Sequence, residues 1–343
     1  LDRYGSAIDY IKKDKFKINA KVYNVFEGEN LTSSARSTGV GILELSSIFE
    51  KLSPDIVITV ADRFETIATA ISASYMNIPL AHIQGGEVTG NIDEKVRHAI
   101  TKLSDYHFVS SKDAFKRVIK LGEEKKYVFN TGCPSIDIAC ELKNKSKINF
   151  NFFDIYKGVG NKIDIKFPFI VVMQHPVTTE YKLSRSQINE TLVAIKDLNF
   201  PTLWFWPNVD AGSDGTSKGI RWFRENKELK NVYFLKNMEP LHFLSILIKS
   251  KCLIGNSSVG IRECAYLGVP VVNIGSRQNR RLRASNVIDV KHCKNEIKEA
   301  VKYHIYRKNK PKSSSIYGKG DSGKQISDIL AKVPLIFNKT IKF

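Results

Sequence analysis

The chain lacks any long apolar run. No stretch reaches the roughly 18 consecutive apolar residues of a membrane span, and the first residues do not follow the pattern of a secretory signal peptide. Its 343 residues are 42% hydrophobic and 26% charged, which is typical of a globular chain with a sizeable core. We therefore predict a cytoplasmic protein without a membrane partner. The length favours two domains of about 100–200 residues each.

The chain has few cysteines and neither of the common phosphate-binding glycine motifs. The five cysteines, Cys133, Cys140, Cys252, Cys264 and Cys293, are odd in number and have no metal-ligand spacing. They indicate reduced thiols and no metal site. Neither GxxxxGK[ST] nor GxGxxG occurs, which argues against a Walker-type loop or a dinucleotide site. We see no short-period repeat and no low-complexity segment apart from lysine patches.

Acidic residues are outnumbered. Asp and Glu total 35 against 53 Lys and Arg, a net charge of +18. Such an excess suits nucleic acid or a membrane surface. The positive charge is, however, spread in short patches at 125–126, 143–147 and 308–312, and no nucleic-acid-binding module accompanies it. We predict no nucleic-acid partner, and a basic surface also suits a doubly charged nucleotide ligand.

Strand and helix patterns alternate twice along the chain. This alternation predicts parallel, doubly wound sheets, hence an α/β protein with two Rossmann-like domains and a ligand cleft between them. A Lys-, Asn- and Gly-rich stretch at 141–166 is the best linker candidate. The predicted domains are 1–150, 151–318, and a last helix within 319–343 that crosses back to the N-terminal domain. The predicted strands are 55–60, 80–83, 106–109 and 127–130, then 169–173, 203–206, 232–235, 252–254 and 271–274; helices are predicted at 66–75, 91–103, 112–121 and 321–333.

Polar residues follow the predicted strands. Ligands of open α/β sheets bind beyond the carboxyl ends of the strands, so these positions are the candidate site. Proton transfer needs carboxyl groups, and three are available, although each alone would more often be a helix cap or an ion-pair member. The carboxylates are Asp62, Glu87 and Asp93; the other candidates after strands are Gln84, His175, Asn208 and Asp210.

The stretch 82–102 joins a strand, a glycine loop and a helix. The paired glycines Gly85 and Gly86 let backbone amides approach a phosphate or a sugar. Asn91 with Glu94 forms a capping-box pattern, which places the helix start at Asn91. Asp93, Arg97 and Thr101 then share one face of this helix. An ordinary capped helix with an ion pair remains the alternative.

A second strand-to-helix junction spans 255–263. Ser257 and Ser258 at a helix N-terminus predict a phosphate site, and Glu263 further along could accept hydrogen bonds from ribose hydroxyls. Ordinary serine capping is the alternative. His175 could bond a phosphate oxygen or act as an acid; the alternative is a purely structural histidine. Arg277, beyond the predicted strand 271–274, suits a pyrophosphate or uracil contact; the alternative is an exposed salt bridge.

Taken in order, these motifs resemble those of the hydrolysing UDP-N-acetylglucosamine 2-epimerases over nearly the whole chain. The motifs are Asp-Arg-Phe-Glu at 62–65, His-Ile-Gln-Gly-Gly-Glu-Val-Thr-Gly at 82–90, Ile-Asp-Glu at 92–94, Arg-His-Ala-Ile-Thr-Lys at 97–102, His-Pro-Val-Thr-Thr at 175–179, Pro-Asn-Val-Asp-Ala-Gly-Ser at 207–213, Gly-Asn-Ser-Ser at 255–258 and Gly-Ser-Arg-Gln at 275–278.

The resemblance implies a glycosyltransferase-B-like fold and the conversion of UDP-GlcNAc and water to UDP and N-acetylmannosamine for sialic acid. Some relatives use a UDP-2,4-diacetamido-2,4,6-trideoxyglucose toward legionaminic acid. The implied reaction eliminates UDP to a 2-acetamidoglucal and then adds water, with no redox cofactor, in a homodimer or homotetramer. By motif, Asp62 and Asp93 transfer protons and Glu87 binds the sugar. The implied UDP ligands are His175, Asn208, Ser257, Ser258, Glu263 and Arg277, and we add Arg97 and Asp210 as binding candidates.

Three features depart from the family pattern. Gln84 stands where many members have a catalytic Glu, so either other carboxylates do the acid–base work, or the substrate differs, or activity is low. Arg280 replaces a usual glycine near the diphosphate loop. The family's opening β-α-β segment is absent, so we expect the first strand of the N-terminal sheet to be missing. The alternatives are a glycosyltransferase with this fold, an inactive UDP-sugar-binding homologue, and a non-hydrolysing epimerase.

Overall fold

The chain folds into two α/β units. The computed structural model describes residues 7–26, 31–89, 92–144, 150–207, 212–226 and 229–342. The first unit comprises Leu1–Pro134 and Asp321–Phe343, and the second comprises Ser135–Gly320. The change of unit falls after Pro134 and not at residue 150, because Ala139 and Leu142 pack in the same apolar core as Phe152.

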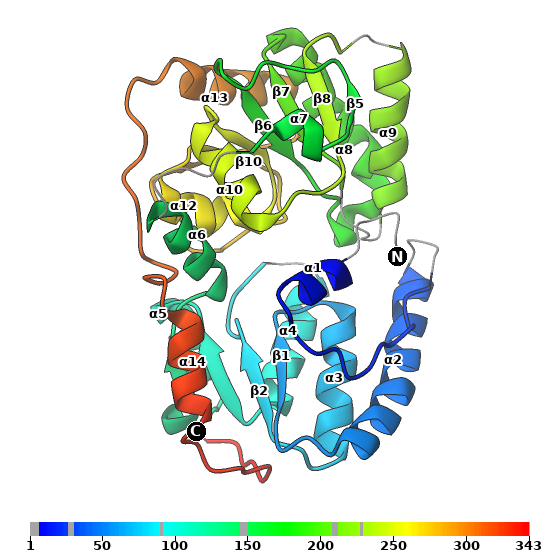
Figure 1. Ribbon diagram of the computed structural model, residues 1–343, viewed down its shortest axis with the longest axis vertical. Coiled ribbons are helices and arrows are strands. Elements are labelled where there is room, and N and C mark those ends of the chain that lie inside the picture. Colours follow the sequence, from blue (N-terminus) through cyan, green and yellow to red (C-terminus); the bar gives the residue numbers. More distant parts are fainter. Residues whose placement is uncertain are drawn as a thin grey trace. The chain divides into compact units, whose positions relative to one another are not determined.

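A parallel sheet forms the centre of the first unit. Among the described residues it has four strands in the order β1-β2-β3-β4, with helices α3, α4 and α5 as the connections (Figure 1). The elements are α1 Ala7–Lys13, α2 Leu31–Leu52, β1 Val57–Val60, α3 Phe64–Tyr75, β2 Leu80–Ile83, α4 Ile92–Leu103, β3 Tyr106–Val109, α5 Lys112–Lys120, a short 3-10 helix Lys125–Tyr127, β4 Val128–Asn130 and α14 Ser322–Leu330.

Burial differs between the strands of this sheet. β2 and β3 are buried at every position, as expected for parallel strands covered on both faces. The prediction of a buried strand at 55–60 was wrong for β1: Ile58 and Val60 are 47% and 48% exposed. β1 is the edge strand among those described, and alternate side chains point to opposite faces, so only Val57 and Thr59 reach the core.

Helices from both ends of the chain cover the first sheet. α2, which the sequence analysis did not predict, lies beside α3 (Figure 1), and its Phe49 packs with Ala70 and Leu80. On the other side, Ile326 of α14 packs against Tyr106 and Phe108 of β3. The last helix therefore completes the core of the unit that contains β1–β4.

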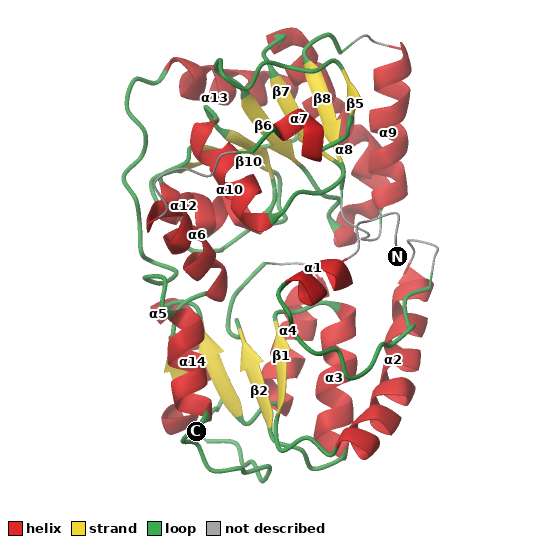
Figure 2. Ribbon diagram, viewed as in Figure 1, coloured by secondary structure: helices red, strands yellow, loops and turns green. Residues whose placement is uncertain are grey.

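The second unit contains a larger sheet. Its described residues form seven strands in the order β11-β10-β9-β6-β7-β8-β5, all parallel except β5, which runs antiparallel to β8 (Figure 2). The elements are α6 Pro134–Asn144, α7 Phe152–Ile155, β5 Val159–Gly160, β6 Ile170–Met173, a 3-10 helix Thr178–Leu183, α8 Ser184–Leu198, β7 Thr202–Phe205, α9 Ser213–Asn226, β8 Val232–Leu235, α10 Pro240–Lys249, β9 Leu253–Gly255, α11 Ser258–Ile261, α12 Glu263–Leu267, β10 Val271–Ile274, β11 Val287–Val290 and α13 Lys294–Tyr306.

Two apolar cores cover the two faces of this sheet. On β6, Val171 belongs to one core and Ile170 and Val172 belong to the other; β7 divides Leu203 and Trp204 in the same way. This alternation is the period-2 pattern of a strand with both faces buried. The strand centres are therefore apolar, and polar chemistry is left to the strand ends.

Candidate functional site

The carboxyl ends of β1 and β2 bring polar residues from separate loops together. Ala61, just after β1, donates its N–H to Ile83 O over 3.0 Å, and Gln84, just after β2, donates to Phe108 O over 2.8 Å. These bonds extend the ladder beyond the last strand residues, so the chain turns away only at Asp62 and Gly85. The loop residues thus start from fixed backbone positions at one edge of the sheet.

Arg97 is the centre of this edge. Its side chain is only 1% exposed, and its guanidinium pairs with the Asp62 carboxylate. It also donates to Glu87 O over 2.8 Å and to Thr89 Oγ1 over 3.4 Å. The rigid fork of donors lets one arginine bind all three loop groups. The structure therefore brings the predicted residues Asp62, Glu87 and Arg97 together.

Glu87 has a hydroxyl partner that sequence reasoning missed. Ser110, directly after β3, donates its Oγ–H to Glu87 Oε1, and both side chains are buried. Glu94 of α4 holds the same loop by accepting from Thr89 N over 3.1 Å. A polar residue after the third strand was the available signal for Ser110. Asp93 lies half-buried in the first turn of α4.

His82, the last but one residue of β2, is buried and neutral. Its Nε2 lies 2.9 Å from Ala61 O and its Nδ1 lies 3.2 Å from Thr101 Oγ1. A carbonyl can only accept, so Nε2 carries the proton. Burial, which disfavours the imidazolium, is the main reason that the pKa of His82 falls to about 3. His82 therefore acts as a structural link between β1 and α4.

The glycine loop is shaped by close packing. Gly86 has φ +74°, and a Cβ atom there would lie 2.5 Å from Ala114 O. Arg117 of α5 donates to Gly86 O over 2.9 Å. Gln84, at φ +69°, donates its amide to the Cys133 Sγ over 3.0 Å. Packing against α5 is thus sufficient to require glycine at 86, whatever ligand the loop meets.

In the second unit Asn256 joins two candidate segments. Its side chain exchanges two hydrogen bonds with the His175 backbone, each of 2.8 Å. Its carbonyl accepts from Arg277 Nη1 over 3.3 Å and from Gln278 Nε2 over 2.9 Å. His175 is 6% exposed. The structure therefore brings His175, Arg277 and the 255–258 loop together, with the buried Asn256 as the link.

The helix predicted after residue 256 is broken. Ser257 caps the four-residue helix α11, and Ser258 Oγ accepts from Arg262 Nη2 over 2.8 Å. Arg262, at φ −101°, ψ −73°, separates α11 from a second short helix, α12, which starts at Glu263. Glu263 therefore lies in the first turn of α12 and not in the helix that the two serines begin. Its Oε2 atom is buried and has no hydrogen-bond partner among the residues that the structure describes.

Further candidates and absences concern the described residues only. Asn208 and Asp210 lie outside them, as does Asn91, the predicted helix cap. Within the described ranges no three His, Cys, Asp or Glu side chains gather as a metal ion requires. No helix in those ranges is long and apolar enough to cross a membrane.

The two sheets and their polar carboxyl edges define the class of protein, which is the glycosyltransferase-B-like α/β fold. The same fold is found in the UDP-GlcNAc 2-epimerase of Methanocaldococcus jannaschii, solved in complex with UDP-GlcNAc and UDP. That structure superposes with a TM-score of 0.77 at 20% identity, over 97% of this chain and 90% of that one.

Sequence comparison gives the family. The model of the UDP-N-acetylglucosamine 2-epimerase family matches residues 3–331, and the chain belongs to this family. A UDP-N,N'-diacetylbacillosamine 2-epimerase (hydrolyzing) of Legionella pneumophila is 33% identical over 339 residues, 98% of this chain and 87% of the relative. A GDP/UDP-N,N'-diacetylbacillosamine 2-epimerase (hydrolyzing) of Campylobacter jejuni is 34% identical over 290 residues, 83% of this chain and 73% of the relative.

Proposed function

We propose that this protein is a hydrolysing UDP-sugar 2-epimerase that converts a UDP-2-acetamido sugar and water to UDP and the free 2-acetamido manno sugar. Membership of the family supports the epimerase activity. The observation that carries the proposal is the buried pairing of Asp62 with Arg97 beside Glu87. Carboxylates held in fixed geometry at a strand-end edge are what proton transfer at a sugar carbon requires.

The first step is an elimination. A carboxylate, Asp62 or Asp93, takes the C2 proton while the C1–O bond breaks and its electron pair leaves with UDP, which gives a 2-acetamidoglucal. Arg97 orients Asp62 for this step. Glu87, itself held by Ser110, binds the sugar. Gln84 cannot take up a proton at neutral pH, so it serves as a hydrogen-bonding residue.

The second step adds water across the double bond. The water oxygen bonds to C1 and its proton passes to the second carboxylate, which gives a proton to C2 from the face opposite to that of abstraction. The first carboxylate then releases the proton that it took in the elimination to solvent. This order inverts C2 and leaves a free sugar. The atoms balance as UDP-sugar plus water giving UDP plus manno sugar, and no redox cofactor takes part.

UDP binding is assigned to the second unit. His175, Ser257, Ser258 and Arg277 offer donors suited to the diphosphate, and Glu263 suits the ribose hydroxyls because its buried Oε2 has no partner within the described residues. Donors on the leaving UDP stabilise the charge that develops as C1–O breaks. Asn208 and Asp210 complete the proposed set.

Two substrates fit this proposal. UDP-GlcNAc, giving N-acetylmannosamine, is the one that the motif series indicates. The relatives at 33% and 34% identity, named for diacetylbacillosamine, favour the UDP-2,4-diacetamido-2,4,6-trideoxy sugar. Either product would serve nonulosonic acid biosynthesis. The proposal includes a cytoplasmic homodimer or homotetramer, as the family resemblance implies.

A proton NMR time course in D₂O, run with each sugar separately, tests the proposal. We expect free UDP and a manno sugar that carries deuterium at C2 from at least one substrate. Release of the UDP-linked manno sugar would identify a non-hydrolysing epimerase. Transfer of the sugar to an acceptor would identify a glycosyltransferase. If UDP binds but neither sugar is consumed, the chain is a UDP-sugar-binding homologue and the catalytic proposal fails.

A further inference from the structure

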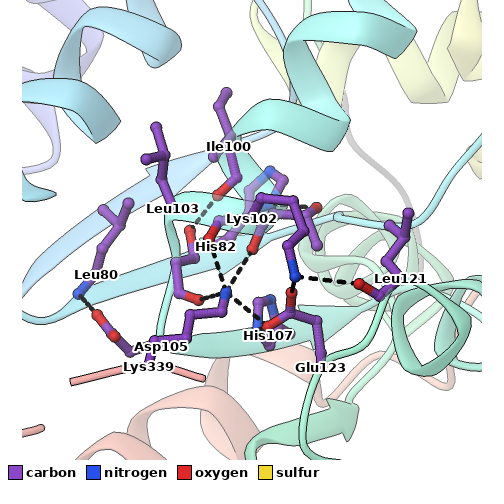
Figure 3. Close-up of polar contacts among 12 residues, drawn as sticks. Leu80, His82, Ile100, Lys102, Leu103, Asp105, His107, Leu121, Glu123 and Lys339 are labelled. Carbon is purple, nitrogen blue, oxygen red and sulfur yellow. Dashed lines mark hydrogen bonds and ion pairs between the residues drawn. The ribbon is translucent and has the colours of Figure 1, made fainter. Parts of the chain in front are cut away.

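A second polar cluster lies at the opposite edge of the first sheet, near the amino ends of β2 and β3. At its centre is Lys339, from the segment that follows α14 (Figure 3). Its ammonium donates to the carbonyl oxygens of Thr101, Lys102 and Ser104 over 3.1, 2.9 and 2.6 Å, and to Glu123 Oε2 over 2.6 Å. The Lys339 ammonium thus meets three carbonyl oxygens and one carboxylate oxygen.

The cluster is a hydrogen-bonded network around the buried carboxylate of Glu123, in which the side chains of Lys339 and Lys102 are 22% and 37% exposed. Glu123 is 2% exposed and also binds Lys102 Nζ over 2.7 Å and His107 Nε2 over 3.0 Å. Burial alone would raise the pKa of Glu123, but the bonds from His107, Lys102 and Lys339 lower it to about 2. Asp105 beside it accepts from Leu80 N over 2.9 Å. The adjoining cavity measures about 20 Å³, enough for about one water molecule.

The carbonyls that Lys339 binds belong to the end of α4. The last carbonyls of a helix have no partner within it and form the negative end of its dipole, where a cation is stabilising. Lys339 therefore caps α4 with a half-buried charge. Because Ser104 O and Thr101 O are bound by the same ammonium, this cap also fixes the turn from α4 into β3.

α4 connects this cap to the candidate active site. Arg97 lies four residues before Thr101, about one helical turn or 5.4 Å along the axis. Thr101 Oγ1 donates to Arg97 O over 3.0 Å and lies 3.2 Å from His82 Nδ1. The Arg97 guanidinium then binds Asp62. A shift or fraying of the last turn of α4 would therefore displace Arg97.

The segment around Lys339 is attached on both sides. Tyr106 OH donates to Pro334 O, and Lys342 N donates to Gly122 O over 2.9 Å. Gly122 has φ +86°, and a Cβ there would lie 2.5 Å from Ile341 Cγ1. Glycine at 122 therefore lets Ile341 lie against this turn. This packing helps to hold the segment that carries Lys339 in place.

We propose that Lys339 is a positioning residue for the epimerase reaction, because it caps α4 and so holds Arg97 against Asp62. The expected effect on kcat rests on the proposed function, whereas the capping of α4 does not. It assigns to the C-terminal segment a role in the reaction although no residue of that segment touches the candidate site residues in the contacts described above.

Lys339→Met, which keeps the length of the side chain but removes its charge, tests this role. We expect kcat to fall about 10- to 100-fold, as for a small displacement of a catalytic group, with less than about a twofold change in KM or in UDP affinity. Lys342→Met, an exposed lysine of the same segment, is the matched control and should behave as wild type. Equal kcat per folded molecule for Lys339→Met and wild type would overturn the proposal.

Chemical rescue separates a missing cation from general destabilisation. Propylammonium added to Lys339→Ala should restore part of kcat in a saturable manner, whereas propanol should not. If Lys339→Met does not fold, Lys339→Arg takes its place. This variant keeps the positive charge in a planar fork, so it should fold and give a kcat between those of wild type and Lys339→Ala. No rescue by the amine, together with full activity of Lys339→Arg, would refute the need for a point charge at the end of α4.

Amide hydrogen exchange decides the inference even if the wild-type protein consumes neither sugar. In Lys339→Met the amides of α4 should exchange at least about 10-fold faster, while those of α2 in the same unit stay as in wild type. Unchanged protection of α4 would overturn the inference. Absence of turnover by the wild-type protein would instead refute the proposed function alone.

Discussion

Arg97 pairs with Asp62 from a position 35 residues further along the chain. The two residues come from the start of one loop and the middle of a helix, and the guanidinium is almost fully buried while the carboxylate is 16% exposed. The carboxylate thus keeps access from outside, and the cation behind it is shielded from water. This arrangement fixes a carboxyl group without hiding it from a substrate.

Arg97→Lys should lower kcat/KM by about 100-fold, because an ammonium cannot reach Asp62, Glu87 O and Thr89 together. We expect a loss of about 1–3 kcal/mol in the free energy of unfolding from the acceptors left unpaired. Steady-state kinetics and urea unfolding measure both effects. Arg63→Lys, in an exposed pair with Glu65, is the control. Wild-type kinetics for Arg97→Lys would contradict the assignment.

Ser110→Ala should lower kcat and Ser111→Ala should leave it unchanged, although the two residues are adjacent. Ser110 binds the buried Glu87, so its loss should lower kcat by about 10-fold, and the loss of this donor should cost about 1–3 kcal/mol of stability. Ser111 caps α5 by accepting from Ala114 N over 3.2 Å, so its loss should cost about 1 kcal/mol of stability and leave kcat unchanged. Equal effects of the two changes on kcat would refute the role of Ser110.

Glu263→Gln should weaken UDP binding without destabilising the fold. The buried Oε2 has no partner in the described part of the chain, so a neutral amide removes a desolvation cost, and the free energy of unfolding should stay equal or rise by about 1 kcal/mol. The dissociation constant for UDP should rise about 10-fold through loss of charge-assisted bonds. Calorimetry measures it, with the exposed Glu299→Gln as control. Unaltered affinity would exclude Glu263 from the site.

Stability should fall as the pH drops below about 6.5. The pKa of His82 is about 3 in the folded protein and about 6.5 when unfolded, so only the unfolded chain takes up this proton between those values. The contribution of neutral His82 is complete above pH 6.5 and is lost progressively down to pH 3, by up to about 1.4 kcal/mol per pH unit. His82→Gln should flatten the slope of unfolding free energy against pH in this window. An unchanged slope would contradict burial as the cause.

The parallel sheet and the candidate site edge of the first unit could be predicted from the sequence because both follow from strand-and-helix alternation. Apolar runs predicted β2 and β3 at the observed residues, and the rule for strand ends predicted that Asp62 and Glu87 would lie close together. β11 was not predicted, since Val287–Val290 is only half-buried and lacks a strong apolar run.

Other features depend on contacts that no local pattern contains. The break at Arg262 is a backbone change within a sequence that favours one helix. Ser110 is unremarkable until β3 is placed beside β2. Lys339 meets Thr101, Lys102 and Ser104 across more than 230 residues of chain, and no local pattern around Lys339 predicts this contact.

The first unit is built from both ends of the chain, and this affects the order in which a newly made polypeptide can fold. Residues 135–320 leave the ribosome before Asp321–Phe343, so the second unit has its full sequence while the first still lacks α14 and Lys339. Until then Tyr106 and Phe108 lack the cover of Ile326, and α4 lacks its cap. The edge of the first unit that carries Asp62 and Arg97 therefore gains its full support only after the second unit has been synthesised.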